Sequence, residues 1–507
     1  MALKNQIKAG AALSYISLLL GNAIALFYTP FMLRSLGQSE FGLFSLANAV
    51  VGYLAVLDFG FGSATVRYTA RYKAERQMER VRYMYGMFIV LYLFIGLITF
   101  AIGFCFSLAA ENLFKGLSLA EIRTVKILLV LASINLAISF PLGVFTSIIT
   151  AYERFIFLKV SAIVRHILNP CVYVPLLFMG QKSVALIIAA SVMNVSFLVM
   201  NLLYCFLRLH IRISFRKFDI LFLKEIMGYS FWIFVGSIVG RLWWNSGQFL
   251  LGVFSSSVAI AIYGLAMQFM SYFESFATAI SGVFLPRMTS MEYRNASGKD
   301  FTDYFIKVGR IQFIIIALIT SGFILFGRQF IYCWVGRDYA QAYFVTIIIF
   351  IPLSLVDTQT LGITILQAKN RHKFRSVIYL CVTLICVILC VPFIKIYGVY
   401  GCAFATALAL TLGNLIVMNW YYYKRIGLDI IRFWQEMLRI LVPVLVLALA
   451  SYFILRLIPE LVSYSTLLPA ILVYAAVYFI VMYFFSFNEY EKSLVRKIKF
   501  YGIRRTS

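Results

Sequence analysis

The sequence predicts an all-α polytopic membrane protein with about 14 transmembrane helices, and two observations support this fold class. Hydrophobic residues make up 62% of the 507 residues and charged residues only 13%, which is more apolar than a soluble domain of this length requires. Apolar stretches of about 20 residues, the length that crosses a hydrocarbon core about 30 Å thick, follow one another along almost the whole chain. Function is therefore expected inside the bilayer.

The predicted spans are separated by short loops. They cover residues 10–33, 41–64, 84–110, 124–150, 161–180, 184–207, 229–254, 259–285, 311–335, 342–368, 377–394, 401–422, 440–458 and 467–486. The longest loop, about 286–310, is polar and too short for a soluble domain. No small-residue cleavage site ends a short apolar region behind Lys4 and Lys8, so the first span is expected to be retained.

Positive charge sets the predicted orientation. Of the 45 lysines and arginines, 34 lie on the N-terminus, the even-numbered loops and the C-terminus, and nine lie on or near the other side. Because cytoplasmic loops are enriched in lysine and arginine, both termini are predicted to be cytoplasmic. The net charge of +25 then needs no nucleic-acid partner, since anionic membrane lipids supply the counter-charge.

Two internal matches indicate a duplication. Ile149–Arg154 at the end of the fourth span resembles Leu366–Arg371 at the end of the tenth, and Glu40–Phe44 resembles Ala261–Leu265, both about 220 residues apart. Six spans per copy give both copies one orientation, as in the parallel repeats of secondary transporters. The predicted domains are an N-lobe of spans 1–6 (1–207), an amphipathic cytoplasmic linker (208–228), a C-lobe of spans 7–12 (229–422), spans 13 and 14 (423–486) and a basic cytoplasmic tail (487–507).

Motifs of common enzymes are missing from the sequence. It holds no Gly-rich phosphate loop before Lys-Ser or Lys-Thr, no HExxH and no GxSxG, and its outer loops are short and poor in ionisable groups. All eight cysteines lie in predicted spans without metal-ligand spacing and are expected to be packing residues. An enzyme is disfavoured, and no cofactor is predicted beyond H⁺ or Na⁺ as a coupling ion.

Arg241 is the most informative charge within a predicted span. It lies near the midpoint of the seventh span, with Ser237, Asn245 and Gln248 at −4, +4 and +7 on one helical face and Trp244 at its border. A charge at that depth costs about 2.5–3.5 kcal/mol even on the lenient insertion scale, so it is expected to serve function. The predicted role is substrate contact in a polar cavity, and the alternative is a structural ion pair.

Two carboxylates occupy central positions in later spans. Glu274 is mid-helix in the eighth span and is the partner for Arg241 in the ion-pair alternative. Asp357 is central in the tenth span, followed by Thr358, Gln359 and Thr360. Each carboxylate is predicted either to pair with an arginine or to bind and release a proton or Na⁺.

Two further charges lie nearer the predicted inner surface. Asp58 precedes Gly60 in the second span and is predicted to pair with Arg67 or Arg71 rather than to act as a gating charge. Arg165 is one turn into the fifth span and is accompanied by His166. This pair is interpreted either as the cationic mouth of a cavity or as an interface anchor.

Several segments of the sequence resemble those of a known protein family. They are Tyr28–Gly37, Glu40–Phe44, Leu57–Ala64, Arg67–Tyr68 and Phe284–Met288. The chain resembles the polysaccharide-transporter branch of the multidrug/oligosaccharidyl-lipid/polysaccharide flippase superfamily, to which O-antigen flippases belong. The resemblance implies two six-helix lobes around a central cavity that opens alternately to each side of a bacterial or archaeal cytoplasmic membrane.

The resemblance also implies a cargo, an undecaprenyl-diphosphate-linked oligosaccharide moved from the cytoplasmic to the outer leaflet. Arg241, Arg165 and Arg287 are predicted to contribute to binding of the diphosphate, and Trp244 to stacking on sugars. A polysaccharide polymerase and chain-length machinery are the protein partners that such a role implies. The charges within the spans and the motifs leave three alternative functions open. They are a drug or cation antiporter, a lipid II flippase, and a non-transporting scaffold of a polysaccharide assembly complex.

Overall fold

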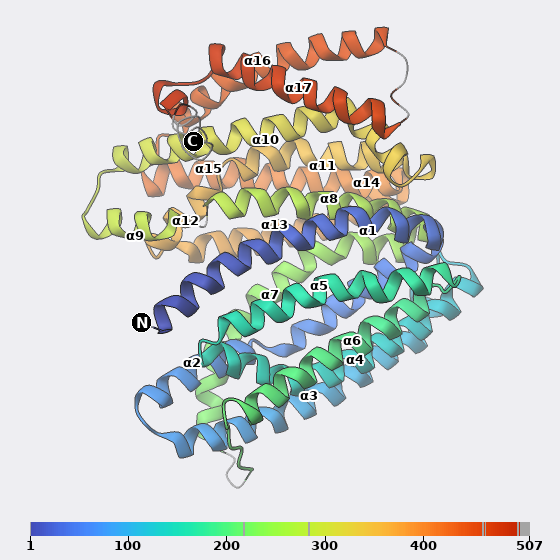
Figure 1. Ribbon diagram of the computed structural model, residues 1–507, viewed down its shortest axis with the longest axis vertical. Helices are drawn as coiled ribbons and strands as arrows, with labels where there is room; N and C mark the ends of the chain where they lie inside the picture. Colours follow the sequence, from blue (N-terminus) through green and yellow to red (C-terminus); the bar gives the residue numbers. More distant parts are fainter. Residues whose placement is uncertain are drawn as a thin grey trace, which may run out of the picture. The chain divides into compact units, whose positions relative to one another are not determined.

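The structure is a computed structural model that describes residues 2–215, 219–281, 284–458, 461, 463–493 and 496 (Figure 1). Every regular element in these ranges is a helix, which confirms the predicted all-α class. The first eight α-helices are α1 (Ala2–Leu54), α2 (Phe61–Ala74), α3 (Met78–Leu113), α4 (Leu119–Ala151), α5 (Phe155–Phe178), α6 (Ser183–Leu207), α7 (Ile220–Phe254) and α8 (Ser257–Ser281).

Further α-helices with defined bounds follow in the described ranges. They are α9 (Leu285–Tyr293), α10 (Gly298–Trp334), α11 (Gln341–Asp357), α12 (Thr360–Ala368), α13 (His372–Tyr397), α14 (Val399–Ala409), α15 (Met418–Tyr421), α16 (Ile430–Leu457) and α17 (Tyr464–Phe485). Short 3₁₀ turns (Ala55–Asp58 and Arg337–Tyr339) and π-helical turns (Leu410–Val417 and Tyr422–Ile426) lie between or within them.

The number of crossings can be bounded from helix length and composition. In the described ranges, 11 helices are long and apolar enough to span a membrane, or up to 12 if the bent parts of α7, Ile220–Gly228 and Ile233–Phe254, form one span. One of the 11 is the stretch Ala12–Ala74, whose 63 residues are roughly 95 Å long as a helix, about three times the hydrocarbon thickness. Gly37 is non-helical within it, with φ 76°. This stretch therefore has the length and the break that two crossings need.

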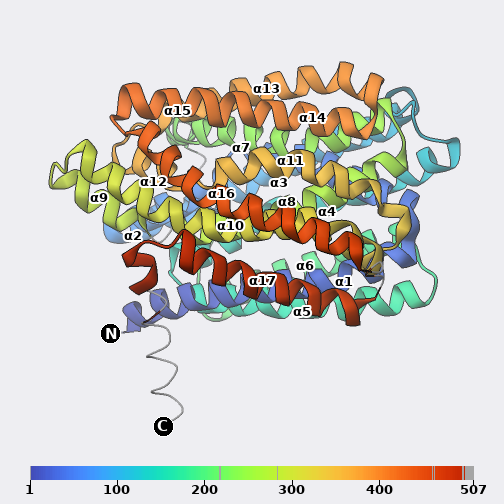
Figure 2. The same ribbon diagram turned by 90° about the horizontal axis from the view of Figure 1, so that it is seen from above.

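The chain divides into two compact units, Met1–Gly264 and Leu265–Ser507. The first unit contains α1 to α7 and the first turns of α8, although the predicted C-lobe begins at residue 229. Compactness and internal duplication are separate properties, so the predicted repeat of six spans stays a prediction. Within each unit the long helices lie side by side along a common direction (Figures 1 and 2).

The core of the first unit is an aromatic layer between α2, α3 and α4. Tyr85, Phe88 and Tyr92 of α3 are fully buried there. Small residues bring α3 against α4, because Gly96 lies on the backbone of Ala137 and leaves no room for a side chain. Close approach through small residues is the usual basis of helix packing in membranes, where lipid is as apolar as the helix surface.

The segment before α7 departs from the sequence-based prediction. An amphipathic helix was expected across 208–228, but residues 208–215 form no helix. Ser214 donates its backbone N–H to the carbonyl of Arg82, so the segment lies along the start of α3. The helix begins only at Ile220, where the Asp219 carboxylate accepts the N–H of Phe222 at 3.0 Å and caps α7.

The second unit is organised around α10, which packs against α16 and α17. Phe305 of α10 stacks on Phe433 of α16 with ring centroids 4.3 Å apart. Tyr478 of α17 is fully buried and donates its hydroxyl to the carbonyl of Ile314 at 2.7 Å. Polar tips of aromatic residues thus find partners on neighbouring helices, as burial requires.

A buried ion network fixes the last two helices to α10. Arg310 is only 3% exposed and binds Glu491 through two nitrogen–oxygen contacts of 2.8 and 3.0 Å. It also reaches Glu436 of α16 at 2.9 Å and the carbonyl of Ser486 at 2.7 Å. Asn488 donates its backbone N–H to Glu491, so both carboxylate oxygens of Glu491 are bonded. The sequence pattern had placed Arg310 in the loop before the ninth span.

Replacing Arg310 tests how far this network stabilises the second unit. Arg310→Ala leaves the buried Glu491 without its cation, so we expect a loss of about 3–5 kcal/mol and a lower unfolding temperature in detergent, followed by tryptophan fluorescence. The control is Arg439→Ala, which removes a 74% exposed arginine from the same Glu436 and should cost at most about 1 kcal/mol. Equal unfolding temperatures for the two variants would contradict the role given to Arg310.

Candidate functional site

Asp58 lies at a break in the predicted second span. The chain leaves the helix at Phe59 and Gly60, both with left-handed backbone, before α2 begins. The Asp58 carboxylate accepts the hydroxyl of Tyr92 at 2.6 Å. The predicted partner was Arg67 or Arg71. Arg71 instead lies 3.0 Å from Glu75 and 3.5 Å from Glu225, and the pairing with Arg67 stays a prediction. A neutral donor within the aromatic layer therefore partners Asp58.

Arg165 and His166 are consecutive residues of α5 in the first unit, and the choice between a cavity mouth and an interface anchor stays a prediction. The His166 ring rests on the bare backbone of Gly21 in α1, where a Cβ would lie 3.2 Å from the ring. Arg165 is half-exposed and close enough to interact electrostatically with His166 and with Tyr173. The imidazole and the guanidinium thus sit at the packing face between α1 and α5.

Two unpartnered polar atoms extend this face. The Tyr28 hydroxyl and the Asn169 side-chain oxygen are buried and have no hydrogen-bond partner among the residues that the structure describes. The Tyr28 ring lies 5.9 Å from that of Tyr173. Because a buried polar group without a partner is costly, this α1–α5 face is a candidate for binding a polar ligand.

The polar face of α7, which carries Ser237, Arg241, Asn245 and Gln248, has an exposed part and a packed part. Arg241 is exposed and makes no hydrogen bond or ion pair with the described residues of its own unit. Asn245 lies against Gly52 of α1, and its buried amide nitrogen has no hydrogen-bond partner among the described residues. Gln248 lies against Gly264 of α8. Trp244 is half-buried. The polar face of α7 is therefore exposed at Arg241, whereas the amide side chains of Asn245 and Gln248 are packed between helices.

A glutamate joins three segments at the other end of the first unit. The Glu121 carboxylate accepts the hydroxyls of Ser39 at 2.6 Å and Ser257 at 2.5 Å on one oxygen. Its other oxygen accepts the N–H and hydroxyl of Ser118, which caps α4. We call this group of four residues the serine–glutamate knot. The sequence signal was the capping box Ser118-x-x-Glu121, but spacing alone did not indicate the serines from α1 and α8.

Glycines tighten the same end. Gly42 of α1 contacts the carbonyl of Ser257, and Gly116 contacts the carbonyl of Ser255, with no space for a Cβ at either glycine. Backbone therefore meets backbone where the α7–α8 turn reaches α1 and the α3–α4 loop. This end of the unit is closed by direct contact.

The second unit holds a buried polar cluster at the break between α11 and α12. Asp357 is 4% exposed, and its Oδ2 has no hydrogen-bond partner among the described residues. Within the part of the chain that the structure describes, both side-chain polar atoms of the neighbouring Gln359 also lack a partner. Gln312 of α10 donates to Thr360 at 2.8 Å, and Thr360 donates to the carbonyl of Asp357 at 2.7 Å.

Glu274 belongs to the same cluster. It interacts electrostatically with Asp357 and with Tyr379 of α13, and its carboxylate has no hydrogen bond to any described residue. The cluster thus combines two carboxylates with amide and hydroxyl oxygens, the ligand types that hard cations prefer. Among the described residues, no group of three or more histidines, cysteines or acidic residues could hold a metal ion. Gln312 and Tyr379 were not identified from the sequence as members of this cluster. The available signal was a polar side chain within an apolar helix.

Arg287 lies apart from these groups. It is exposed on α9 in the second unit and donates to the Tyr304 hydroxyl at 2.9 Å, with its guanidinium 5.4 Å from that ring. The structure therefore brings together Arg165 with His166, and Glu274 with Asp357. It assigns Arg241 and Arg287 to different units.

The chain is similar to a known protein family. The family model described as "Polysaccharide biosynthesis protein" matches residues 7–292, more than half of the chain. The chain belongs to this family. The match covers the motifs on which the predicted resemblance was based and confirms it.

Two curated relatives are similar over most of the chain. The "Putative O-antigen transporter" of Shigella flexneri is 22% identical over 414 residues, 78% of this chain and 92% of its own length. The "Uncharacterized membrane protein EpsK" of Bacillus subtilis is 23% identical over 435 residues, 81% of each protein.

Solved structures share the fold. The lipid II flippase MurJ in an inward closed conformation matches with a TM-score of 0.72 at 19% identity, over 94% of this chain and 98% of its own. An inward-facing multidrug resistance transporter of the MATE family matches with a TM-score of 0.65 at 13% identity, over 80% of this chain and 94% of its own. The protein is a multi-pass membrane protein of this family with the fold of these transporters, and the relatives and structures that it matches are transporters and not enzymes.

Labelling of a cysteine at Arg241 tests whether its open side faces water. In a background without the eight native cysteines, Arg241→Cys should react quickly with a charged, membrane-impermeant thiol reagent, because thiolate forms in water and not in hydrocarbon. The matched control is Leu97→Cys on α3, where the side chain is also exposed but lies on an apolar helix surface. Slow labelling at both positions would mean that Arg241 faces lipid.

Proposed function

We propose that the protein flips a polyprenyl-diphosphate-linked oligosaccharide from the cytoplasmic to the outer leaflet by alternating access. The observation that carries this proposal is Arg241, an exposed cation without a partner among the described residues of its own unit, in the middle of an apolar helix of a polysaccharide-biosynthesis protein. The name of the Shigella relative supports an oligosaccharide cargo. The setting is a bacterial or archaeal cytoplasmic membrane, with 14 spans, cytoplasmic termini and a polymerase as functional partner.

The cargo explains why such cations are needed. A diphosphate and sugar hydroxyls cannot enter hydrocarbon without replacement of their hydration. Arginine binds phosphate oxygens through several N–H groups at once and keeps its charge in an apolar setting. Arg241, Arg165 and Arg287 are the residues proposed for this role, while Trp244 offers a face for sugar stacking.

The carboxylate cluster of the second unit suits ion coupling. Asp357 and Gln359 present unpartnered oxygens at a helix break, the arrangement in which transporters bind Na⁺ or protons. We propose that Glu274 and Asp357 bind the coupling ion. The same acidic cluster is what a cation antiporter would need, and the MATE fold match makes that the second candidate.

The first test measures flipping of a fluorescent undecaprenyl-diphosphate oligosaccharide in proteoliposomes. Arg241→Ala should slow flipping by about tenfold or more, since it removes a charge-assisted contact, while Arg241→Lys should retain most of the rate. Wild-type flipping by Arg241→Ala at equal protein density would remove this residue from the mechanism. If the lipid stays in place while an organic cation moves, the antiporter candidate replaces the flippase.

The second test concerns coupling. Asp357→Asn keeps the size of the side chain and removes its charge, so flipping should lose its dependence on an imposed proton or Na⁺ gradient while slow gradient-independent flipping persists. Asp303→Asn is the control, because Asp303 is an exposed carboxylate paired with Arg432 on the surface of the same unit. A gradient response unchanged by Asp357→Asn would show that the ion binds elsewhere.

A further inference from the structure

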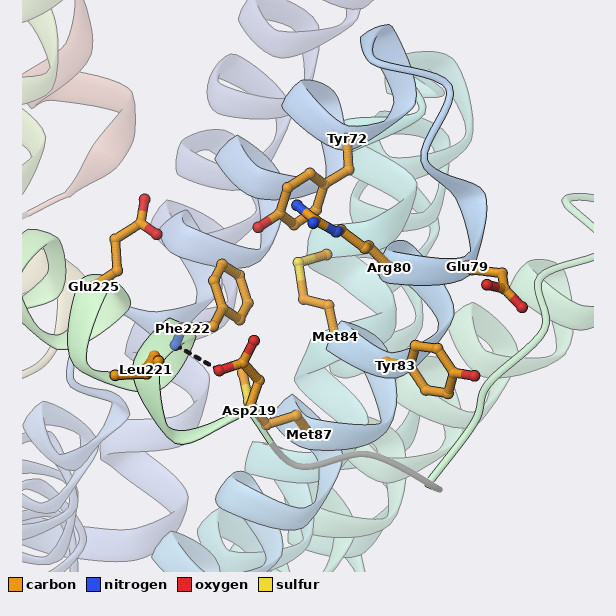
Figure 3. A pocket seen from close by; sticks show the side chains of 10 residues that line it. All are labelled: Tyr72, Glu79, Arg80, Tyr83, Met84, Met87, Asp219, Leu221, Phe222 and Glu225. Carbon is orange, nitrogen blue, oxygen red and sulfur yellow. Dashed lines mark hydrogen bonds between the residues drawn. The ribbon is translucent and has the colours of Figure 1, made fainter.

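A pocket separate from these groups opens in the first unit, where α2 ends and where α3 and α7 begin (Figure 3). Its volume is about 530 Å³. It lies at the end of the unit that the charge pattern predicts to be cytoplasmic. The lining residues are Tyr72, Glu79, Arg80, Tyr83, Met84, Met87, Asp219, Leu221, Phe222 and Glu225.

Two opposite charges face the middle of this pocket. Figure 3 shows the guanidinium of Arg80 beside the ring of Tyr72, and its central carbon lies 6.0 Å from the ring centroid. Arg80 has no ion pair or hydrogen bond among the described residues. Asp219 uses Oδ1 to cap α7 through Phe222, and its second oxygen has no partner in the described chain. Among the residues that the structure describes, the pocket therefore offers one free cation and one free carboxylate oxygen.

The other acidic groups contribute differently. Glu225 is engaged by Arg71 at 3.5 Å and by the Tyr68 hydroxyl at 3.2 Å. Glu79 lies at the rim and points away from the centre (Figure 3). Together with Asp219 they give the described part of the lining three carboxylates against one arginine, so a purely anionic ligand is disfavoured.

The walls and the surroundings of the pocket are apolar. Phe222 packs edge-on against Tyr68 and tilted against Tyr72, with centroids 5.1 and 5.7 Å away, and Met84 is buried beneath. Beside the mouth, Leu221 is 81% exposed, and its neighbours Ile220 and Phe215 are exposed as well. Large exposed apolar side chains next to charged ones are typical of a protein surface at the membrane interface.

We propose that this pocket binds the head group of a zwitterionic aminophospholipid. The primary ammonium donates to the free oxygen of Asp219 and lies against the aromatic rings, and the phosphate binds Arg80. The acyl chains pass over Leu221 into the bilayer. A phosphocholine head group satisfies the phosphate but has no N–H for Asp219, and a phosphoglycerol head group brings negative charge without a cation to a lining rich in carboxylates.

Binding at this place has a structural consequence. The ligand contacts α3 through Arg80 and the first turn of α7 through Asp219, so it connects the two helices where the irregular segment 208–215 joins them. The proposal concerns lipid recognition and does not depend on the transported cargo.

The experiment measures binding of phosphatidylethanolamine, phosphatidylcholine and phosphatidylglycerol, each with short acyl chains, to the delipidated full-length protein by native mass spectrometry. Wild type should bind phosphatidylethanolamine most tightly. Asp219→Asn should weaken that binding by about tenfold, because it removes the charge while asparagine still caps α7. Arg80→Gln should weaken phosphatidylethanolamine and phosphatidylcholine alike.

The matched control is Asp429→Asn. Asp429 caps α16 by accepting the N–H of Arg432 at 3.0 Å, so the substitution makes the same chemical change at another helix start. It should leave lipid binding unchanged. Equal affinity for the three lipids, or equal loss in Asp219→Asn and Asp429→Asn, would overturn the proposal.

Discussion

Hydrocarbon offers no hydrogen-bond partner, and the arrangement of polar groups in this protein depends on that constraint. Backbone groups in the bilayer must be bonded within helices, so irregular backbone is tolerated only where other groups satisfy it. The breaks in the long helices accordingly carry polar side chains. Asp58 lies at one break and is bonded by Tyr92, and Asp357 lies at another beside Thr360. A helix break and a charged side chain occur together because the free backbone groups at the break and the buried carboxylate both need polar groups nearby.

The two units satisfy this constraint with different types of polar side chain. Arginine, histidine and tyrosine gather on the α1–α5 face of the first unit, while carboxylates and amides gather at the α11–α12 break of the second. In the proposed mechanism the first set suits an anionic lipid-linked cargo and the second suits a small cation.

Properties of single helices could be predicted from the sequence, whereas contacts between helices could not. The all-α class, the family and the adjacency of Arg165 and His166 follow from composition, motif and local order. The partners of Arg310 could not be predicted, because Glu491 lies 181 residues away and nothing in its spacing indicates α10. The same holds for Ser257 on Glu121, 136 residues apart. Helical periodicity tells which residues share a face and leaves open which helix lies opposite.

The glycine contacts beside the serine–glutamate knot restrict how the α7–α8 turn can move. The carbonyls of Ser255 and Ser257 fill the spaces that side chains at Gly116 and Gly42 would occupy. Surfaces in such close contact cannot slide past one another, because any shift along the helix axis would drive a carbonyl into a neighbouring side chain. They can still tilt about the contact. The turn therefore acts as a pivot, and α7 is free to rock about this point more readily than to move along its own length.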